Sequence, residues 1–132
     1  MKQKGFSLVE LLAVIVILGV LSGVAINAYS RYKSSAVKEG INTLIKSSYS
    51  AAENYFFDNS GASSVTIQFL VDHGYLENRS DPYKPSRKCT GTITKTTNTS
   101  SKEGVLNLYS FQVTVTCSGN TFCKKFPEET TC

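Results

Sequence analysis

The first part of the chain is a long apolar run. From Phe6 to Ile26 almost every side chain is apolar or small, and Glu10 is the only charged residue in the run. As an α-helix, a segment of this length would be about 30 Å long, which is close to the thickness of a bilayer's hydrocarbon core. The pattern therefore predicts a membrane-spanning helix with one carboxylate near its start.

After Ile26 the uniform run gives way to a helical period. Residues suited to a buried face recur at intervals of three and four, and they are Tyr29, Tyr32, Val37, Ile41, Leu44, Ile45, Ser48, Ala52, Tyr55 and Phe56. This spacing is typical of an amphipathic helix. No proline occurs before Pro82, so we expect one helix from Phe6 to about Phe57.

A second, shorter helix is expected between the long helix and the rest of the chain. Thr66 to Gly74 reads as a helix with Thr66 as a candidate N-cap and Gly74 just after its end. His73 would lie near the negative end of the helix dipole. Of the two interpretations of His73, a capping role or a catalytic or ligand role, we favour the structural one.

The last third of the chain has the composition of β-strands. Cys89–Thr96 and Leu106–Cys117 alternate polar and β-forming residues, with a polar loop at Asn98–Gly104 between them, and Thr121–Phe126 is a candidate third strand. We therefore expect an α+β fold, in which a long N-terminal helix packs on a small antiparallel β-sheet. Pairing the first two strands would place Cys89 opposite Cys117.

All four cysteines lie beyond the apolar run, at Cys89, Cys117, Cys123 and Cys132. A zinc site is the alternative to disulfides, but the spacing contains no C-x2-C pair and the one histidine is distant. An even number of cysteines indicates disulfides formed in an oxidising, extracytoplasmic compartment. Four cysteines allow three connectivities, of which the strand pairing favours Cys89–Cys117, leaving Cys123–Cys132.

Charge and motifs argue against several classes of function. The formal net charge is +4, and 12 basic against 10 acidic residues remain once Lys2 and Lys4 are removed. Lys84, Arg87 and Lys88 form only a faint basic patch, so a nucleic-acid partner is not supported. The sequence shows no phosphate-binding loop and no nucleophile–base set, and we predict that the protein is not an enzyme and needs no cofactor.

A metal site is not expected either. Asp72 and Asp81 are the candidate calcium ligands in the middle of the chain, but two separated carboxylates are a poor ligand set for this ion. Asp81 precedes Pro82, and this pair is more typical of a turn.

Glu10 is costly in a membrane, by about 2.5 to 3.5 kcal/mol on insertion scales, so it should have a specific role. Gly5 lies just before the run and has no side chain, which suits close approach of a protease. Cleavage between Gly5 and Phe6 would create an amino group four residues before Glu10. This group could balance the carboxylate, either in the same chain or in a neighbouring one.

Gly5-Phe6-Ser7-Leu8-Val9-Glu10 resembles the processing site of bacterial type IV pilins and pseudopilins, and the resemblance continues through Gly19 and Tyr29. It implies that a prepilin peptidase cleaves after Gly5, that Phe6 is then N-methylated, and that Glu10, Phe6 and Gly19 serve assembly. Asn27 stands where many family members have a proline. A plain secretory signal peptide, cut near Ala25, is the alternative, and the carboxylate in the apolar run argues against it.

The resemblance also implies a domain organisation. Residues 1–5 would be a leader peptide, 6–28 a transmembrane and assembly helix, and 29–132 a globular head. Within the head we expect a connector at 58–87, similar in Gly74-Tyr75-Leu76 and Asp81-Pro82-Tyr83 to that of pilins, and a β-sheet with disulfides at 88–132.

The expected function is that of a structural subunit of a type IV pilus or pilus-like filament. Its partners would be other copies and other pilins, the peptidase and the assembly machinery, and the membrane before assembly. The alternative is a minor pilin or a competence or type II secretion pseudopilin with a binding role in DNA uptake, adhesion or secretion. The flanking lysines and arginines do not fix the orientation. The cysteines and the leader favour an inner-membrane precursor with its C-terminal domain outside the cytoplasm, and a cell-surface filament after assembly.

Overall fold

The computed structural model describes residues 4–97 and 109–132. The chain divides into two compact units, Met1–Ala36 and Val37–Cys132. The loop expected at Asn98–Gly104 and the first residues of the strand expected from Leu106 lie outside the described residues.

One helix, α1 (Leu8–Asp58), passes through both units. Within the described part of the chain, it is the one helix that is long and apolar enough to cross a membrane. The helix begins at Leu8, two residues after the expected start at Phe6, because Ser7 caps it. It ends at Asp58, next to the predicted last residue, Phe57. Asn27, in place of a proline, keeps its backbone N–H and lies within the continuous helix.

The second unit contains a five-stranded antiparallel sheet with the order β1-β2-β3-β4-β5. Its strands are β1 (Ser64–Thr66), β2 (Thr90–Thr97), β3 (Tyr109–Cys117), β4 (Asn120–Phe126) and β5 (Thr130–Thr131). The two predicted main strands, their antiparallel pairing and the third strand are confirmed. The short strands β1 and β5 were not predicted, since two or three residues cannot show an alternating pattern.

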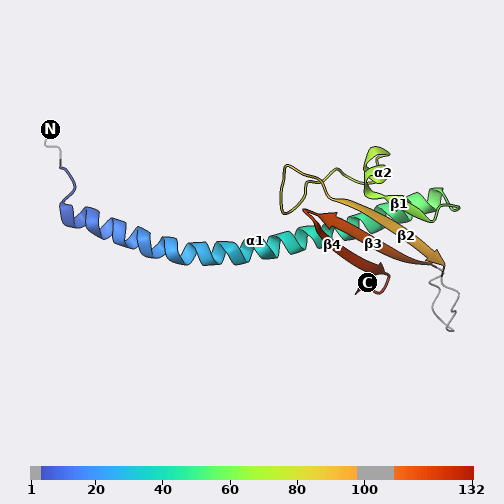
Figure 1. The fold of residues 1–132 in the computed structure, drawn as a ribbon. Helices are drawn as coiled ribbons and strands as arrows, with labels where there is room; N and C mark the ends of the chain where they lie inside the picture. Colours follow the sequence, from blue (N-terminus) through green and yellow to red (C-terminus); the bar gives the residue numbers. More distant parts are fainter. Residues whose placement is uncertain (1–3, 98–108) are drawn as a thin grey trace. The chain divides into compact units, whose positions relative to one another are not determined.

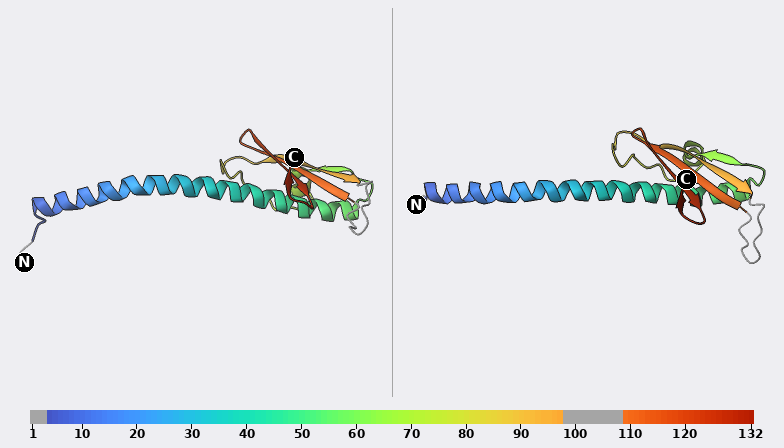
Figure 2. Two further views of the ribbon diagram at one scale, coloured as in Figure 1. Left: turned by 90° about the horizontal axis from the view of Figure 1, so that it is seen from below. Right: turned by 60° about the horizontal axis from the view of Figure 1, so that its bottom comes forward.

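The sheet packs on the part of α1 that belongs to the second unit (Figures 1 and 2). Alternate residues of β3 point into this interface, and Val113, Val115 and Cys117 are completely buried there. The helix contributes a buried stripe of Val37, Ile41, Leu44, Ile45, Ser48, Ala51, Ala52 and Phe56. The predicted α+β arrangement is therefore confirmed. The buried stripe begins at Val37, however, and the side chain of Tyr32, which the period had included, is 72% exposed.

The short helix α2 (Ile67–Asp72) begins and ends where the sequence predicted. The Phe69 N–H donates a hydrogen bond to Thr66 Oγ1 over 3.2 Å, which confirms Thr66 as the N-cap. His73 follows the last helical residue, and its ring stacks on Phe69 with 3.8 Å between ring centroids. Its Nδ1 lies 2.9 Å from the Phe69 carbonyl oxygen. These contacts all lie within the helix end, in agreement with the structural interpretation of His73.

The connector between α2 and β2 is held against both the helix and the sheet. A Cβ atom at Gly40 would lie 3.1 Å from Cγ of Pro82, so the glycine allows the connector to approach α1 closely. Asp81 beside it is buried, and its Oδ1 accepts a hydrogen bond from the Tyr83 N–H over 2.7 Å, as in the turn that the sequence predicted.

Two disulfides link Cys89 to Cys117 and Cys123 to Cys132. The first joins the residue before β2 to the last residue of β3, with 4.5 Å between the two Cα atoms. Since Thr90 pairs with Thr116 in the sheet, the antiparallel register places Cys89 opposite Cys117.

Candidate functional site

The candidate site is the segment from Gly5 to Ile26, which belongs to the first unit. Gly5 and Phe6 precede α1, and the side chain of Phe6 is 85% exposed. An enzyme that cuts between them needs an extended stretch of backbone, and these two residues are not committed to a helix. The Gly5–Phe6 bond is where the resemblance of the N-terminal segment to pilins predicts cleavage.

Ser7 fixes the start of the helix. Its Oγ accepts a hydrogen bond from the Glu10 N–H over 3.3 Å, and its carbonyl oxygen accepts one from the Leu11 N–H over 3.1 Å. Ser7 is therefore an N-cap and Glu10 is the third helical residue. Ser-x-x-Glu before an apolar run is the sequence signature of a capping box, so this signal is sufficient to find the role of Ser7 from the sequence.

The cap places Glu10 in the first turn of α1, where the positive end of the helix dipole favours a carboxylate. Phe6 lies outside the helix, two residues before Leu8. The spacing that would put Phe6 and Glu10 on one helix face requires both residues to be helical. In this conformation of the chain, the helix itself does not bring the two residues together.

The helix beyond Glu10 presents an apolar surface on all sides. Its large side chains are between 48% and 67% exposed, and they are Leu11, Leu12, Val14, Ile15, Val16, Ile17, Leu18, Val20, Leu21, Val24 and Ile26. The Ser22 hydroxyl donates a hydrogen bond to the Leu18 carbonyl over 2.7 Å, so this polar group is satisfied within the helix. The segment is thus suited to lipid or to the apolar interior of an assembly.

Gly19 and Gly23 interrupt this surface. A Cβ atom at either position would meet no other atom within 4 Å. No close packing within the described chain therefore requires a glycine at these two positions. Small residues on an apolar helix are typical of sites where another helix approaches closely.

A cluster of potential metal ligands lies in the second unit, where an Asp81 oxygen and the Cys89 and Cys117 sulfurs are within 4.8 Å of one another. The two sulfurs form a disulfide, and only a thiolate is a good ligand. Both Asp81 oxygens accept hydrogen bonds, from Tyr83 and from Ser118. The disulfide and the hydrogen bonds of Asp81 therefore give this cluster a structural role.

Asp72 and Asp81, the candidate calcium ligands, make different contacts in different parts of the second unit. Asp72 accepts a hydrogen bond from Gln68 Nε2 over 2.8 Å on the exposed side of α2, whereas Asp81 is buried in the connector. Burial opposes ionisation of Asp81, but the hydrogen bonds from Ser118, Tyr83 and Lys84 outweigh it and lower the pKa of the carboxyl group.

Residues 1–26 match the family model of the prokaryotic N-terminal methylation motif. The chain is 26% identical to the type IV major pilin protein PilA of Myxococcus xanthus over 82 residues, which are 62% of this chain and 36% of that protein. It is 39% identical over 57 residues to the type IV major pilin protein PilE1 of Neisseria gonorrhoeae, covering 43% of this chain and 34% of that protein.

A fimbrial protein of Neisseria meningitidis serogroup B is also 39% identical over 57 residues, with coverage of 43% and 34%. The chain thus spans about a third of the length of the curated relatives that it matches. No solved structure is significantly similar to it. In its methylation motif and in the segment that it shares with major pilins, the chain is similar to type IV pilins, and the long apolar helix followed by an antiparallel sheet agrees with this similarity.

Proposed function

We propose that the protein is a structural subunit of a type IV pilus or pilus-like filament. The observation that carries this proposal is the exposed apolar surface of α1 from Leu11 to Ile26, beside a second unit that has its own buried core. Such a helix needs either lipid or other helices around it. The matched relatives are described as major pilins and a fimbrial protein, which supports a filament subunit over an accessory binding role.

Before assembly, the precursor is anchored in the inner membrane by α1, with its second unit outside the cytoplasm. A prepilin peptidase cleaves it between Gly5 and Phe6, and Phe6 is N-methylated. The methylation motif over residues 1–26 supports this processing. The two disulfides support an extracytoplasmic second unit, because such bonds form and persist in oxidising compartments.

During assembly, α1 moves from lipid into a bundle of equivalent helices. The net cost is small, since both environments are apolar. Glu10 pairs with the Phe6 amino group of a neighbouring subunit, and this pair selects one axial register because any other register leaves a buried charge without a partner. Gly19, Ser22 and Gly23 allow neighbouring helices to approach closely.

Glu10→Val tests the assembly mechanism. We expect normal export and cleavage, because valine enters the bilayer more easily than a carboxylate, but processed subunit should accumulate in the membrane without filaments. The measurement compares processed subunit in membranes with subunit in sheared surface filaments. Glu39→Val is the matched control, since Glu39 is exposed on α1 beyond the apolar run. Normal filaments from the Glu10 variant would contradict the pairing mechanism.

The processing step is tested by the intact mass of the exported protein. The mass should correspond to a chain that begins at methylated Phe6. A chain that begins near Ile26 would instead indicate an ordinary signal peptide, and a chain that retains residues 1–5 would exclude cleavage at Gly5.

A further inference from the structure

The second unit contains a cavity whose volume is about 750 Å³, a size typical of small-molecule sites. It lies between the end of α1, the turn that follows it, and β2 and β3. The described residues that line it are Tyr49, Glu53, Asn54, Phe56, Phe57, Ser60, Lys95, Tyr109, Phe111 and Pro127. All of them belong to the second unit, so the cavity is separate from the apolar segment proposed for assembly.

Aromatic rings form much of the cavity wall. Phe56 and Phe111 are almost completely buried, and their ring centroids are 5.9 Å apart. Tyr49 contacts Phe111 edge to face. Phe57, in contrast, is 88% exposed, and Tyr109 is 45% exposed. The cavity therefore combines a fixed aromatic wall with an exposed ring that a ligand could cover.

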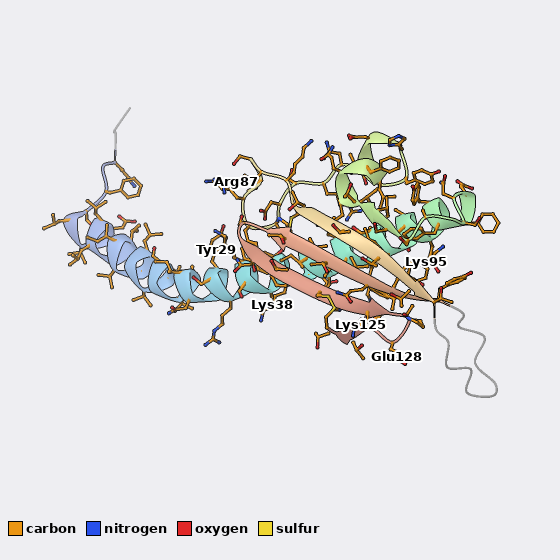
Figure 3. All side chains as sticks on the ribbon, turned by 45° about the vertical axis from the view of Figure 1, so that its right-hand side comes forward. Tyr29, Lys38, Arg87, Lys95, Lys125 and Glu128 are labelled. Atoms are coloured by element: carbon orange, nitrogen blue, oxygen red, sulfur yellow. A yellow bond between two sulfur atoms is a disulfide. The ribbon has the colours of Figure 1, made fainter. Side chains whose placement is uncertain are left out.

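Among the described residues of the wall, Glu53 and Lys95 carry opposite charges. Lys95 Nζ is 5.1 Å from the centre of the Phe56 ring and 5.0 Å from that of Tyr109, and it donates a hydrogen bond to the Ser60 carbonyl over 3.1 Å. Glu53 Oε1 accepts a hydrogen bond from the Tyr49 hydroxyl over 2.8 Å. Burial and the bond to Glu53 raise the pKa of Tyr49 to about 12, so the hydroxyl keeps its proton. Figure 3 shows Lys95 toward the end of the sheet opposite to Arg87.

These contacts restrict the chemistry of a ligand. A cation would have to displace the Lys95 ammonium from the two rings, and an anion would lie near the Glu53 carboxylate. A wholly apolar ligand would remove water from both charges without replacing their hydrogen bonds. The cavity therefore suits an uncharged ligand that has an apolar face and several hydroxyl groups.

A neutral peptide also combines apolar and polar groups, but it usually binds by adding a strand to a free sheet edge. Here β2 is an inner strand of the sheet, and the Lys95 N–H already donates to the Ser63 carbonyl. The cavity offers side-chain donors and acceptors instead, from Glu53, Asn54, Ser60 and Lys95. This arrangement favours a ring-shaped ligand over an extended backbone.

We propose that this cavity binds an uncharged sugar ring at the end of a glycan. The apolar face of the sugar stacks on Phe57, while its hydroxyl groups bond to the second carboxylate oxygen of Glu53, to Lys95 and to Asn54. Because Glu53 and Lys95 carry opposite charges, the described wall has no net charge that would favour sialylated, sulfated or amino sugars over neutral ones. This gives the subunit a recognition site that does not depend on assembly.

Glycan arrays test the proposal, with the full processed chain in detergent and sheared filaments as the two samples. The arrays carry neutral, sialylated, sulfated and free-amine oligosaccharides, and a peptide array is run beside them. We expect binding to neutral oligosaccharides by both samples. Phe57→Ala should weaken it about fivefold to tenfold, since a stacked ring contributes on this scale. Tyr83→Ala, at an exposed ring outside the cavity, is the matched control and should bind as the parent does.

Charge variants give a sharper test. Glu53→Gln should gain binding to sialylated or sulfated glycans, and Lys95→Met should gain binding to free-amine oligosaccharides. Thermal unfolding and filament yield show that each variant folds and assembles. Three results would overturn the proposal: no neutral glycan bound by either sample, equal binding by Phe57→Ala and parent, or binding to peptides alone. None of these results bears on whether the subunit forms filaments.

Discussion

The Ser118 hydroxyl donates a hydrogen bond to Oδ2 of Asp81 over 2.7 Å, across a separation of 37 residues. Ser118 and Gly119 form the two-residue turn between β3 and β4, and both have positive φ, at 48° and 83°. Two such residues in succession are the signature of a type I′ hairpin turn. The hydrogen bond thus stabilises a turn whose positive φ is unfavourable for serine. Its acceptor, Asp81, lies in the connector that precedes β2.

Asp81→Asn should lower the free energy of unfolding at neutral pH by about 1 to 3 kcal/mol, because it weakens hydrogen bonds made to a buried charge. The pKa of Asp81 is lowered in the folded chain, so ionised Asp81 stabilises the fold above the ordinary value near 3.8, and this contribution is lost as the pH falls through the lowered pKa. The difference between parent and variant should therefore shrink in acid.

The measurement is urea unfolding of the full chain in detergent, followed by tyrosine fluorescence at neutral pH and at a pH below the ordinary value. Asp72→Asn is the control, since Asp72 is exposed and accepts a hydrogen bond from Gln68. A pH-independent difference between Asp81→Asn and parent would show that the carboxylate charge is not responsible.

Replacing both Cys89 and Cys117 by alanine should cost about 2 to 4 kcal/mol of stability. The effect should exceed that of replacing Cys123 and Cys132, because the first disulfide spans 28 residues and the second spans 9. Cys117 is also completely buried, whereas Cys132 is exposed. Peptide mapping without reduction checks the pairing itself. Recovery of any other pair would contradict the structure.

Gly91→Ala should destabilise the fold by about 1 to 3 kcal/mol or more. Gly91 pairs with Val115, and a Cβ atom there would collide with the Thr114 carbonyl oxygen and with the Ile67 side chain. Gly61→Ala is the control, because a Cβ atom at Gly61 meets nothing within 4 Å. Thermal unfolding compares the two variants, and equal midpoints would rule out the close approach at Gly91.

Gly19→Leu should reduce the amount of filament but leave insertion and processing of the subunit intact. In the single chain there is space for a side chain at Gly19, so a defect would have to come from neighbouring helices. Val16→Leu, a small enlargement on the same apolar segment, is the control. If Gly19→Leu formed as much filament as the parent, Gly19 would not lie at a close contact between neighbouring helices.

The elements that the sequence predicted well depend on short-range patterns. The apolar run and the helical period define α1, and the cap residue Thr66 marks the start of α2. The antiparallel pairing of β2 with β3 followed from two alternating segments, and the cysteines opposite each other agree with its register.

Features that join distant residues could not be predicted in this way. Asp81 and Ser118 show no local pattern that links them, and Lys95 meets Phe56 only after β2 packs near the end of α1. The aromatic cavity is for this reason invisible in the sequence. Tyr32 fits the helical period as well as Val37 does, yet only Val37 is buried. A helical period identifies the apolar face of a helix, but it does not show where along the helix the packed sheet begins.

The disulfide between Cys89 and Cys117 has a consequence for proteolysis. A protease that cuts the chain anywhere between these residues would leave both pieces covalently joined, and β2 and β3 would stay paired at their disulfide-linked ends. Release of a fragment would require a reductant as well as a protease. Outside the cell, where thiols are scarce, a subunit cut once in this region would keep both pieces and gain only the mass of one water, and the pieces would separate only after reduction.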